Sequence, residues 1–371
     1  MSYLKKDAVL AAIKSRDLEH DGEKYTIFEA YLGTDPYSKK PVRMSARNVE
    51  KLRKKVTAFF NYANADRRAA VTAKPVDDKG VLRSGKGGEK LPLELSEGDG
   101  FYVMLPNAAG ELELKKTDDA ARLADLRKNF KIDPKEDLGD AYDAASAIVT
   151  DDDGHRWRFP YANEAMRGAY ARDGRLCREC CTERDLLNLA GILYELPAEN
   201  AGGFSKVRSI ATTGVSAYDY CTWRGLFVIS GLRPAQEGLG KVITSDDGKA
   251  SVWVGVADDL WKFGKAVGVG GPWKDTAVKA GVPSDPYLMT GFDRKSVTVS
   301  ADRDVSVSFE FDLTGTGVWV KSPVSHAGSA GLAVPLKAGR PVTIDMGDIR
   351  AYWVRAVADK DCTATVQFKY E

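Results

Sequence analysis

Hydrophobic and polar residues alternate along the C-terminal part of the chain. The alternation runs through residues 297–299, 305–313, 342–346 and 364–370. A period of two places every second side chain on the same face of a strand. Turn-forming segments rich in Gly, Asp, Thr and Pro separate the runs. The pattern predicts an antiparallel, Ig-like β-sandwich of six or seven strands over residues 290–371.

The preceding region, residues 98–289, carries short hydrophobic runs that each follow a glycine. The glycines are Gly100, Gly154, Gly191, Gly225 and Gly248, and the runs are residues 101–105, 155–159, 192–196, 226–229 and 251–254. A glycine turn followed by one strand is typical of a propeller blade, and equally of a plain β-meander. The spacing is irregular, so both interpretations stay open for this β-rich body.

The first 72 residues predict a small α+β unit. Residues 3–16 have helical hydrophobic spacing, residues 25–32 are rich in aromatic and β-branched residues, and residues 42–44 can form a returning strand. Ser45 is a candidate N-cap for a helix that runs to about residue 63.

Two further segments complete the organisation of the chain. Residues 73–97 are polar and glycine-rich and predict a linker, whereas residues 117–146 predict one or two surface helices. The expected fold class is therefore mainly β, with a propeller-like or meander body between the α+β unit and the sandwich.

Composition narrows the functional classes. The 371 residues include 43% hydrophobic and 29% charged residues, as in ordinary globular domains, and the formal net charge of +1 argues against one global electrostatic partner. No signal-peptide core follows the N-terminus, and no run of 18 apolar residues occurs. We expect a cytoplasmic chain with no membrane partner. Residues 84–88 lack the Walker spacing and follow no strand, and residues 268–271 lack a following helix, so we expect no cofactor.

Several sequence blocks in the second half form a recognisable set. They are GILYELPAEN (191–200), WRGLFVISG (223–231), DLWK (259–262), GPWKDT (271–276), PSDPYLMTGFD (283–293) and YWVRAVADKDCTAT (352–365). Together they resemble a bacterial family with a β-propeller-like body, a C-terminal β-sandwich and no reaction that we can assign. The resemblance covers residues 150–371. It implies a histidine in the stretch matching residues 211–215, where this chain has threonine.

The N-terminal unit resembles the arm-type DNA-binding module of tyrosine recombinases. The resemblance rests on residues 25–32, the GTDPY turn at 33–37 and the basic helix after Ser45. A recombinase also needs a catalytic domain with arginines, a histidine and a nucleophilic tyrosine. With three histidines in the chain, we identify no such domain and expect no recombinase activity.

A basic cluster surrounds this predicted helix. It comprises Lys39, Lys40, Arg43, Arg47, Lys51, Arg53, Lys54 and Lys55, with Glu50 the one acid among them. Such a face can neutralise phosphates of nucleic acid or another polyanion, with strong salt dependence. The alternative is a solvated face of an amphipathic helix.

Cysteines are the candidate metal ligands. Cys177 and Cys180 have the two-residue gap of a zinc-binding turn, and Cys181 is adjacent. The second paired motif of a zinc site is missing. We therefore expect reduced structural thiols and no metal.

Acidic and aromatic residues of the body supply the remaining candidates. A glycosidase needs two facing carboxylates, for which Asp258, Asp259 and Glu195 are candidates, although acids at strand ends are more often turn formers. Trp253, Trp261 and Trp273 can instead line a carbohydrate groove, or pack in the core.

The sequence as a whole favours a non-catalytic binding or structural protein. The expected ligand is glycan-like and held on the β body. A glycoside hydrolase that uses paired carboxylates is the enzyme alternative. An assembly component with protein partners and a polyanion-binding N-terminal unit is the third class.

Overall fold

The computed structural model describes most of the chain. The described residues are 4–20, 22–34, 41–63, 70–73, 92–129, 139–151, 153–167, 174–181, 184–212, 218–231, 242–321, 333–347 and 349–371. They form six β-sheets and a few helices, which confirms the mainly-β fold class. The chain divides into two compact units. Unit 1 comprises Met1–Ile132, Asp173–Arg175 and Gly214–Asp259, and unit 2 comprises Asp133–Arg172, Leu176–Thr213 and Leu260–Glu371.

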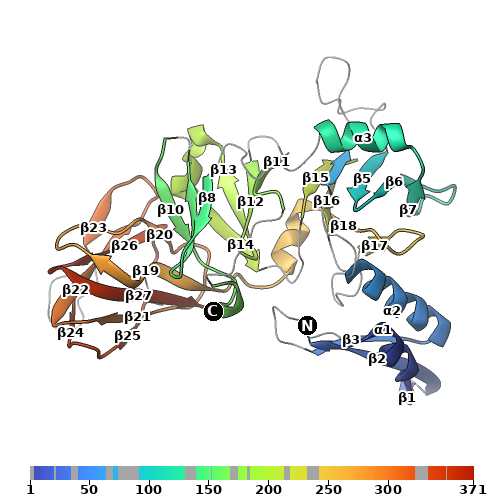
Figure 1. Cartoon of the computed structure of the whole chain (residues 1–371), viewed down its shortest axis with the longest axis horizontal. Helices are drawn as coiled ribbons and strands as arrows, with labels where there is room; N and C mark the ends of the chain where they lie inside the picture. The colour runs from blue at the N-terminus through green and yellow to red at the C-terminus, as the bar shows by residue number, and fades with distance from the viewer. Residues whose placement is uncertain are drawn as a thin grey trace. The chain divides into compact units, whose positions relative to one another are not determined.

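Unit 1 begins with a three-stranded antiparallel sheet that packs against two helices (Figure 1). The elements are α1 (Lys6–Ala11), β1 (Lys14–His20), β2 (Glu23–Thr34), β3 (Pro41–Ala46) and α2 (Val49–Ala63). Leu52, Val56 and Phe60 lie on one side of α2 and join a small core with Leu32 and Met44. This confirms the small α+β unit.

Two local predictions for this unit were wrong. The helix expected over residues 3–16 ends at Ala11, and strand β1 takes the next residues because they pair with β2 along their full length. Ser45 is not an N-cap, since it lies in β3 opposite Glu29. The cap is Asn48, whose Oδ1 accepts a hydrogen bond from the Lys51 backbone N–H at 2.9 Å.

The rest of unit 1 consists of two four-stranded antiparallel sheets. The first has the order β4 (Ala70–Ala73), β5 (Leu93–Glu97), β6 (Gly100–Pro106) and β7 (Leu112–Thr117), and is followed by α3 (Ala120–Asn129). The second has the order β15 (Tyr220–Trp223), β16 (Leu226–Ser230), β18 (Ser251–Gly255) and β17 (Val242–Thr244). Both sheets contribute to one hydrophobic core.

Strand β5 corrects the expected linker at residues 73–97. Its side chains Leu93 and Leu95 are fully buried, so the end of that segment belongs to a sheet and not to a connection. Because most residues around these two leucines are polar, the average composition of the segment resembled that of a linker. Residues 74–91 lie outside the described part of the chain.

Unit 2 contains a four-stranded antiparallel meander and a short sheet segment. The meander is β11 (Cys177–Cys181), β12 (Arg184–Leu189), β13 (Ile192–Pro197) and β14 (Arg208–Thr212). The sheet segment is β8 (Gly139–Tyr142), β9 (Ala147–Thr150) and β10 (Arg156–Phe159). Short 3-10 helices are η2 (Glu164–Met166), η3 (Glu199–Ala201) and η4 (Gly203–Lys206), and η5 (Ala257–Lys262) spans the boundary of the two units.

The C-terminal strands of unit 2 form two facing sheets (Figure 1). One has the order β19 (Gly268–Val278), β27 (Cys362–Tyr370), β21 (Lys295–Ala301) and β25 (Val342–Asp345). The other includes β23 (Trp319–Lys321), β22 (Val305–Asp312), β24 (Ala333–Leu336), β26 (Trp353–Ala358) and β20 (Tyr287–Leu288). Buried and part-exposed residues alternate along β21 and β22, as the period-two pattern predicted.

The sandwich does not begin at residue 290. Strand β19 pairs with β27 from Gly268 onward, and β20 pairs with β26 on one side and with β10 on the other. Through β20 the second sheet continues into β9 and β8, which makes it eight-stranded. One hydrophobic core therefore spans the sandwich and strands β9, β10, β12 and β13. The sandwich and this part of the β body form one folding unit.

The five glycine-led runs all coincide with strands: β6, β10, β13, β16 and β18. Gly191 and Gly225 each lie in a two-residue hairpin turn with positive φ, next to Ala190 and Arg224, which also have positive φ. This backbone is typical of tight turns whose twist matches that of the paired strands. At Gly191 and Gly225, the glycine that precedes the hydrophobic run therefore belongs to a hairpin turn of a meander.

Candidate functional site

An open hollow on unit 2 combines an exposed aromatic ring with a charged pair. Its volume is about 350 Å³, at the small end of the range for ligand sites. The residues that line it are Ile210, Trp261, Lys262, Gly264, Lys265, Ala266, Gly291 and Asp293. Strand β14, the segment after η5 and the turn before β21 therefore meet here.

Trp261 projects from the end of η5. Its side chain is 49% exposed, whereas its neighbour Leu260 is buried and anchors the helix. Ala266 is buried as well, and Val267 and Thr212 exchange two hydrogen bonds of 2.8 and 2.9 Å that tie the following segment to β14. A large apolar ring is thus held at the surface by a fixed backbone.

The turn at residues 290–293 forms the opposite side of the hollow. Gly291 has φ +83°, and a Cβ there would lie 2.2 Å from Ser209 Oγ, so glycine is required for this close approach to β14. Phe292 is buried and stacks on Tyr370 with ring centroids 4.3 Å apart. Both contacts fix the neighbouring Asp293.

Asp293 and Lys265 form an ion pair at the hollow, with Nζ and Oδ2 2.7 Å apart. The hydrogen bond from Lys265 lowers the pKa of Asp293, and the positive charges of Lys265, Lys295 and Arg294 lower it further. Both members of the pair are more than 60% exposed, since their side-chain values are 73% and 65%. The carboxylate is therefore ionised and accessible, and the ammonium has further donors to offer.

The other two predicted ligand-binding tryptophans are core residues. Trp253 on β18 is 2% exposed and lies against Phe227, and Trp273 on β19 is 5% exposed within the core of unit 2. Their faces are covered by apolar neighbours, so they do not line a groove. Of the three, Trp261 alone has a ring available to a ligand.

The candidate catalytic acids have different local surroundings. Asp259 is buried, and its Oδ2 accepts a hydrogen bond from the Val256 backbone N–H at 3.1 Å, a turn-capping contact. The side chain of Asp258 is exposed at the start of η5. Glu195 is buried in β13 and forms a salt bridge with Arg208. These contacts favour the structural interpretation of Asp259 and Glu195.

The basic cluster is spread over several surfaces of the N-terminal sheet and helix. Lys51, Lys54 and Lys55 lie on one flank of α2 by helical periodicity, and all three are exposed. Arg53 lies on another flank, 3.8 Å from Glu50. Arg43 is on β3, and Arg47 lies over the Tyr25 ring at 4.5 Å. Lys39 and Lys40 lie outside the described residues.

The cysteine cluster lies at strand β11. Cys177 is partly buried and packs against the core of unit 2. The side chains of Cys180 and Cys181 lie outside the described part of the structure. Among the residues that are described, no group of three or more His, Cys, Asp or Glu side chains could hold a metal ion.

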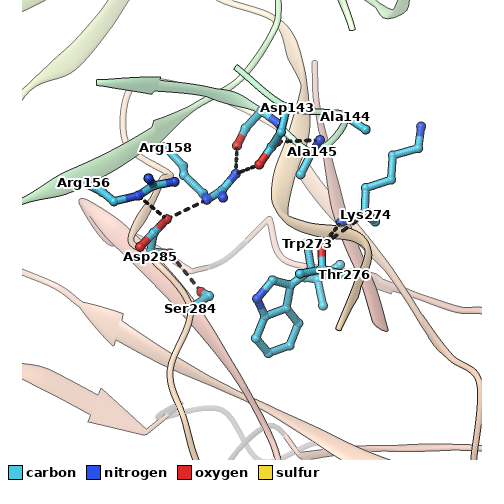
Figure 2. A network of polar contacts seen from close by, with 12 residues as sticks. Asp143, Ala144, Ala145, Arg156, Arg158, Trp273, Lys274, Thr276, Ser284 and Asp285 are labelled. Carbon is cyan, nitrogen blue, oxygen red and sulfur yellow. Dashed lines mark hydrogen bonds and ion pairs between the residues drawn. The ribbon is translucent and has the colours of Figure 1, made fainter. Parts of the chain in front are cut away.

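One polar network in unit 2 was not anticipated. Figure 2 shows Arg158 of β10 between the carboxylates of Asp143 and Asp285, to which it donates hydrogen bonds of 2.9 and 3.1 Å. Arg158 also reaches buried Ser146, and Arg156 donates to Asp285. Only 10% of the Arg158 side chain is exposed.

This network ties the β8–β9 turn and β10 to the segment before β20. Residues so distant in sequence give no local motif, so sequence reasoning could not find them. The carboxylates of Asp143 and Asp285 both accept hydrogen bonds from arginine guanidinium groups. We interpret the network as a structural link between neighbouring segments of the shared sheet.

Comparisons with known proteins leave the family open. No protein-family model and no curated protein matches the chain. Among solved structures, the chain is similar to a glycoside hydrolase family 43 arabinoxylan arabinofuranohydrolase from Bacillus subtilis in complex with cellotetraose, at 10% identity over 96% of this chain and 93% of that one. The TM-score of 0.18 is too low for this similarity to carry an argument. None of these comparisons supports the resemblance to recombinases.

None of the described helices is both long enough and apolar enough to cross a bilayer.

Proposed function

We propose that this protein binds a glycan-like ligand without cleaving it, and that Trp261 and the Lys265–Asp293 pair form the binding site. The observation that carries the proposal is a half-exposed tryptophan at a hollow of about 350 Å³ that also contains an ion pair. Large aromatic rings are normally covered in a folded protein. A ring held at the edge of a hollow is suited to contact with a ligand.

The chemistry of the lining fits a sugar. The face of the indole ring carries the negative part of its quadrupole, which attracts the weakly positive C–H groups on one face of a sugar ring. Lys265 supplies donors and Asp293 supplies acceptors for the hydroxyl groups at the edge of that ring. Ile210 and Ala266 add apolar contact.

The lining favours binding over hydrolysis. A glycosidase needs two carboxyl groups, about 5 Å apart for retention and about 6.5–9.5 Å apart for inversion. Of the described residues that line the hollow, Asp293 alone carries a carboxylate. The hydrolase alternative would need a second acid, and the capped Asp259 and the paired Glu195 are poor sources of one.

Removing the Trp261 ring tests the proposal. Calorimetry with a panel of soluble plant and bacterial oligosaccharides should find one that binds, and Trp261→Ala should weaken that binding at least tenfold, about 1.4 kcal/mol. Trp261→Phe should recover part of the affinity. Val318→Ala is the control, because Val318 is 63% exposed and does not line the hollow. Equal affinities of Trp261→Ala and the unmodified protein would exclude this site.

A second candidate function is polyanion binding by the N-terminal unit. Within the described residues, Lys51, Lys54 and Lys55 form no ion pair, and they lie on the same flank of α2. Three unneutralised ammonium groups at i, i+3 and i+4 can contact successive phosphates. Nucleic acid carries regularly spaced phosphates along its backbone, so it is the proposed partner.

The salt dependence of binding tests this second function. Affinity for a random DNA duplex should fall steeply as salt rises, and replacing the three lysines with glutamine should reduce the slope of log K against log salt by about 2–3. Arg53→Gln is the matched control, because Arg53 is already paired with Glu50. If the triple substitution leaves the slope unchanged, the three lysines of α2 do not form the binding surface.

A further inference from the structure

We infer that one face of the N-terminal sheet binds single-stranded nucleic acid, with bases stacked on the Tyr31 ring and on the Arg47 guanidinium group. This open face is the side of strands β1 to β3 opposite to the core that they share with α1 and α2. The inference is independent of the sugar site in unit 2, and it uses none of the three lysines of α2.

Alternation along β2 defines the open face. Ala30 and Leu32 join the small core with Met44 of β3 and with residues of both helices. Successive side chains of a strand point to opposite faces, so the odd-numbered positions of β2 lie on the other side of the sheet. Between the two tyrosines of the strand, this row is Tyr25, Ile27, Glu29 and Tyr31. Each of these side chains is at least partly exposed.

Basic residues of the neighbouring strands stand beside this row. Arg43 of β3 lies directly opposite Tyr31, and Lys14 of β1 lies directly opposite Glu29. Residues opposite each other in an antiparallel pair have their side chains on the same face. Arg16, two residues further along β1, forms an ion pair with Glu29 at 3.0 Å. Strands on both sides of β2 therefore add positive charge to the open face.

Part of this charge is not neutralised. Arg43, Arg47 and Lys14 are exposed, and they form no ion pair with any residue that the structure describes. The carboxylate of Glu29 is already paired, and a second acid, Glu23, lies beyond Tyr25 at the turn between β1 and β2. A strand of phosphates is complementary to three free cations spread along such a face.

Two flat groups on the open face are suited to stacking. The Tyr31 side chain is 45% exposed, and a hydrogen bond of 3.2 Å between its Oη and Thr34 Oγ1 holds the ring in place. The Arg47 guanidinium lies over the Tyr25 ring, 4.5 Å from its centre. Nucleic-acid bases stack on aromatic rings and on guanidinium planes alike. Tyr25 and Tyr31 are six residues apart, about 20 Å in a strand, which leaves room for several nucleotides.

This arrangement favours a single strand over a duplex. In a duplex the bases stack on one another and present only their edges to a protein. In a single strand the faces of the bases are free to contact an exposed ring, and the phosphates remain available to the cations. Aromatic and basic side chains on one sheet face therefore match a single strand.

Removing the Tyr31 ring tests the stacking. Fluorescence anisotropy with a labelled oligothymidylate of about 15 nucleotides measures the affinity of the full chain. Tyr31→Ala should weaken binding at least fivefold, whereas Tyr31→Phe keeps the ring and should stay within about twofold of the unmodified protein. Tyr142→Ala is the matched control, because Tyr142 is 48% exposed on strand β8 of unit 2.

The charge of the face is tested by the salt dependence of the same binding. Arg43→Gln should reduce the slope of log K against log salt by about 0.7, the value for one phosphate contact of a single strand. Arg53→Gln is the control, because Arg53 is on α2 and is paired with Glu50. An equal change of slope in both variants would contradict a specific role of the open face.

The remaining outcomes separate this surface from the helix flank. Replacing Lys51, Lys54 and Lys55 with glutamine should weaken oligothymidylate binding less than Tyr31→Ala does. The opposite order would place the binding on α2 and overturn the inference. It also fails if the full chain does not bind oligothymidylate, if Tyr31→Ala binds as tightly as the unmodified protein, or if a duplex of the same length binds more tightly than the single strand.

Discussion

Tyr287 and Tyr370 are two buried tyrosines of unit 2 whose hydroxyl groups have different surroundings. Tyr370 Oη donates a hydrogen bond to the Leu288 carbonyl oxygen at 2.6 Å. Tyr287 Oη is buried without a hydrogen-bond partner among the described residues. The two rings lie 5.9 Å apart within the same core, so they form a matched pair.

Replacing each tyrosine with phenylalanine should give opposite results. Tyr370→Phe leaves the Leu288 carbonyl without its donor and should lower the free energy of unfolding by about 1–2 kcal/mol. Tyr287→Phe removes a buried polar group that gains nothing from burial, so stability should stay the same or rise by up to about 1 kcal/mol. Denaturant unfolding of both variants measures this. A loss of more than about 1 kcal/mol in Tyr287→Phe would indicate a hydrogen bond to Tyr287 Oη.

The buried tyrosines should also make the folded protein less stable at alkaline pH. Burial raises the pKa of both Tyr287 and Tyr370 well above the ordinary value, and it also raises the pKa of Tyr102 in unit 1. In the unfolded chain these groups titrate near pH 10. Because the folded pKa values are higher, their contribution is fully present below about pH 10 and is lost as pH rises above it.

Unfolding free energies measured between pH 8 and 12 should therefore be level up to about pH 10 and then fall. Tyrosinate absorbance should show these tyrosines titrating together with the loss of structure. Titration of every tyrosine near pH 10 while the fold persists would contradict the burial of these hydroxyls.

At the scale of elements, the start of α2 shows how a local signal can mislead. Ser45 and Asn48 both have side chains suited to capping, and the two candidates are three residues apart. Ser45 pairs with Glu29 across the sheet, so β3 continues past it and the helix starts one turn later. Because Ser45 is held in strand β3, Asn48 is the residue that caps the helix.

Substitution of the two candidates separates them. Asn48→Ala should lower the free energy of unfolding of the N-terminal unit by about 1 kcal/mol, because the Lys51 N–H loses its acceptor. Ser45→Ala should change it by less than about 0.5 kcal/mol. Thermal unfolding followed by circular dichroism measures both. A larger loss of unfolding free energy in Ser45→Ala than in Asn48→Ala would indicate that Ser45 is the N-cap.

At the scale of the whole molecule, the sandwich shares its second sheet and its core with the body strands of unit 2. Residues 290–371 by themselves would lack β19, the neighbour of β27, and β20, which joins β26 to β10. Trp353, fully buried in the intact protein, donates its indole N–H to the Ser205 carbonyl at 2.9 Å, far outside that fragment.

A fragment of residues 290–371 should consequently fail to fold. Its circular dichroism should lack a cooperative thermal transition, and it should bind hydrophobic dyes through the face that β19 covers in the intact chain. The full chain measured under the same conditions is the control. A cooperative transition in the fragment would restore the sandwich as an independent domain.

Sequence by itself determined the features that depend on local periodicity and turn chemistry. Alternation in residues 297–313 and glycines such as Gly191 and Gly225 specified strands and hairpins, because these follow from side-chain direction and from backbone that favours glycine. The same patterns also predicted the mainly-β class.

Only the tertiary structure decided which residues meet. It buried Trp253 and Trp273 while leaving Trp261 exposed, it brought Lys265 next to Asp293, and it joined the sandwich to the body. Trp261 and Trp273 are each followed by a lysine, yet one is exposed and the other is buried, so the local sequence does not separate them. Burial and ion pairing depend on segments far apart in the chain, and their partners are set by how the sheets pack.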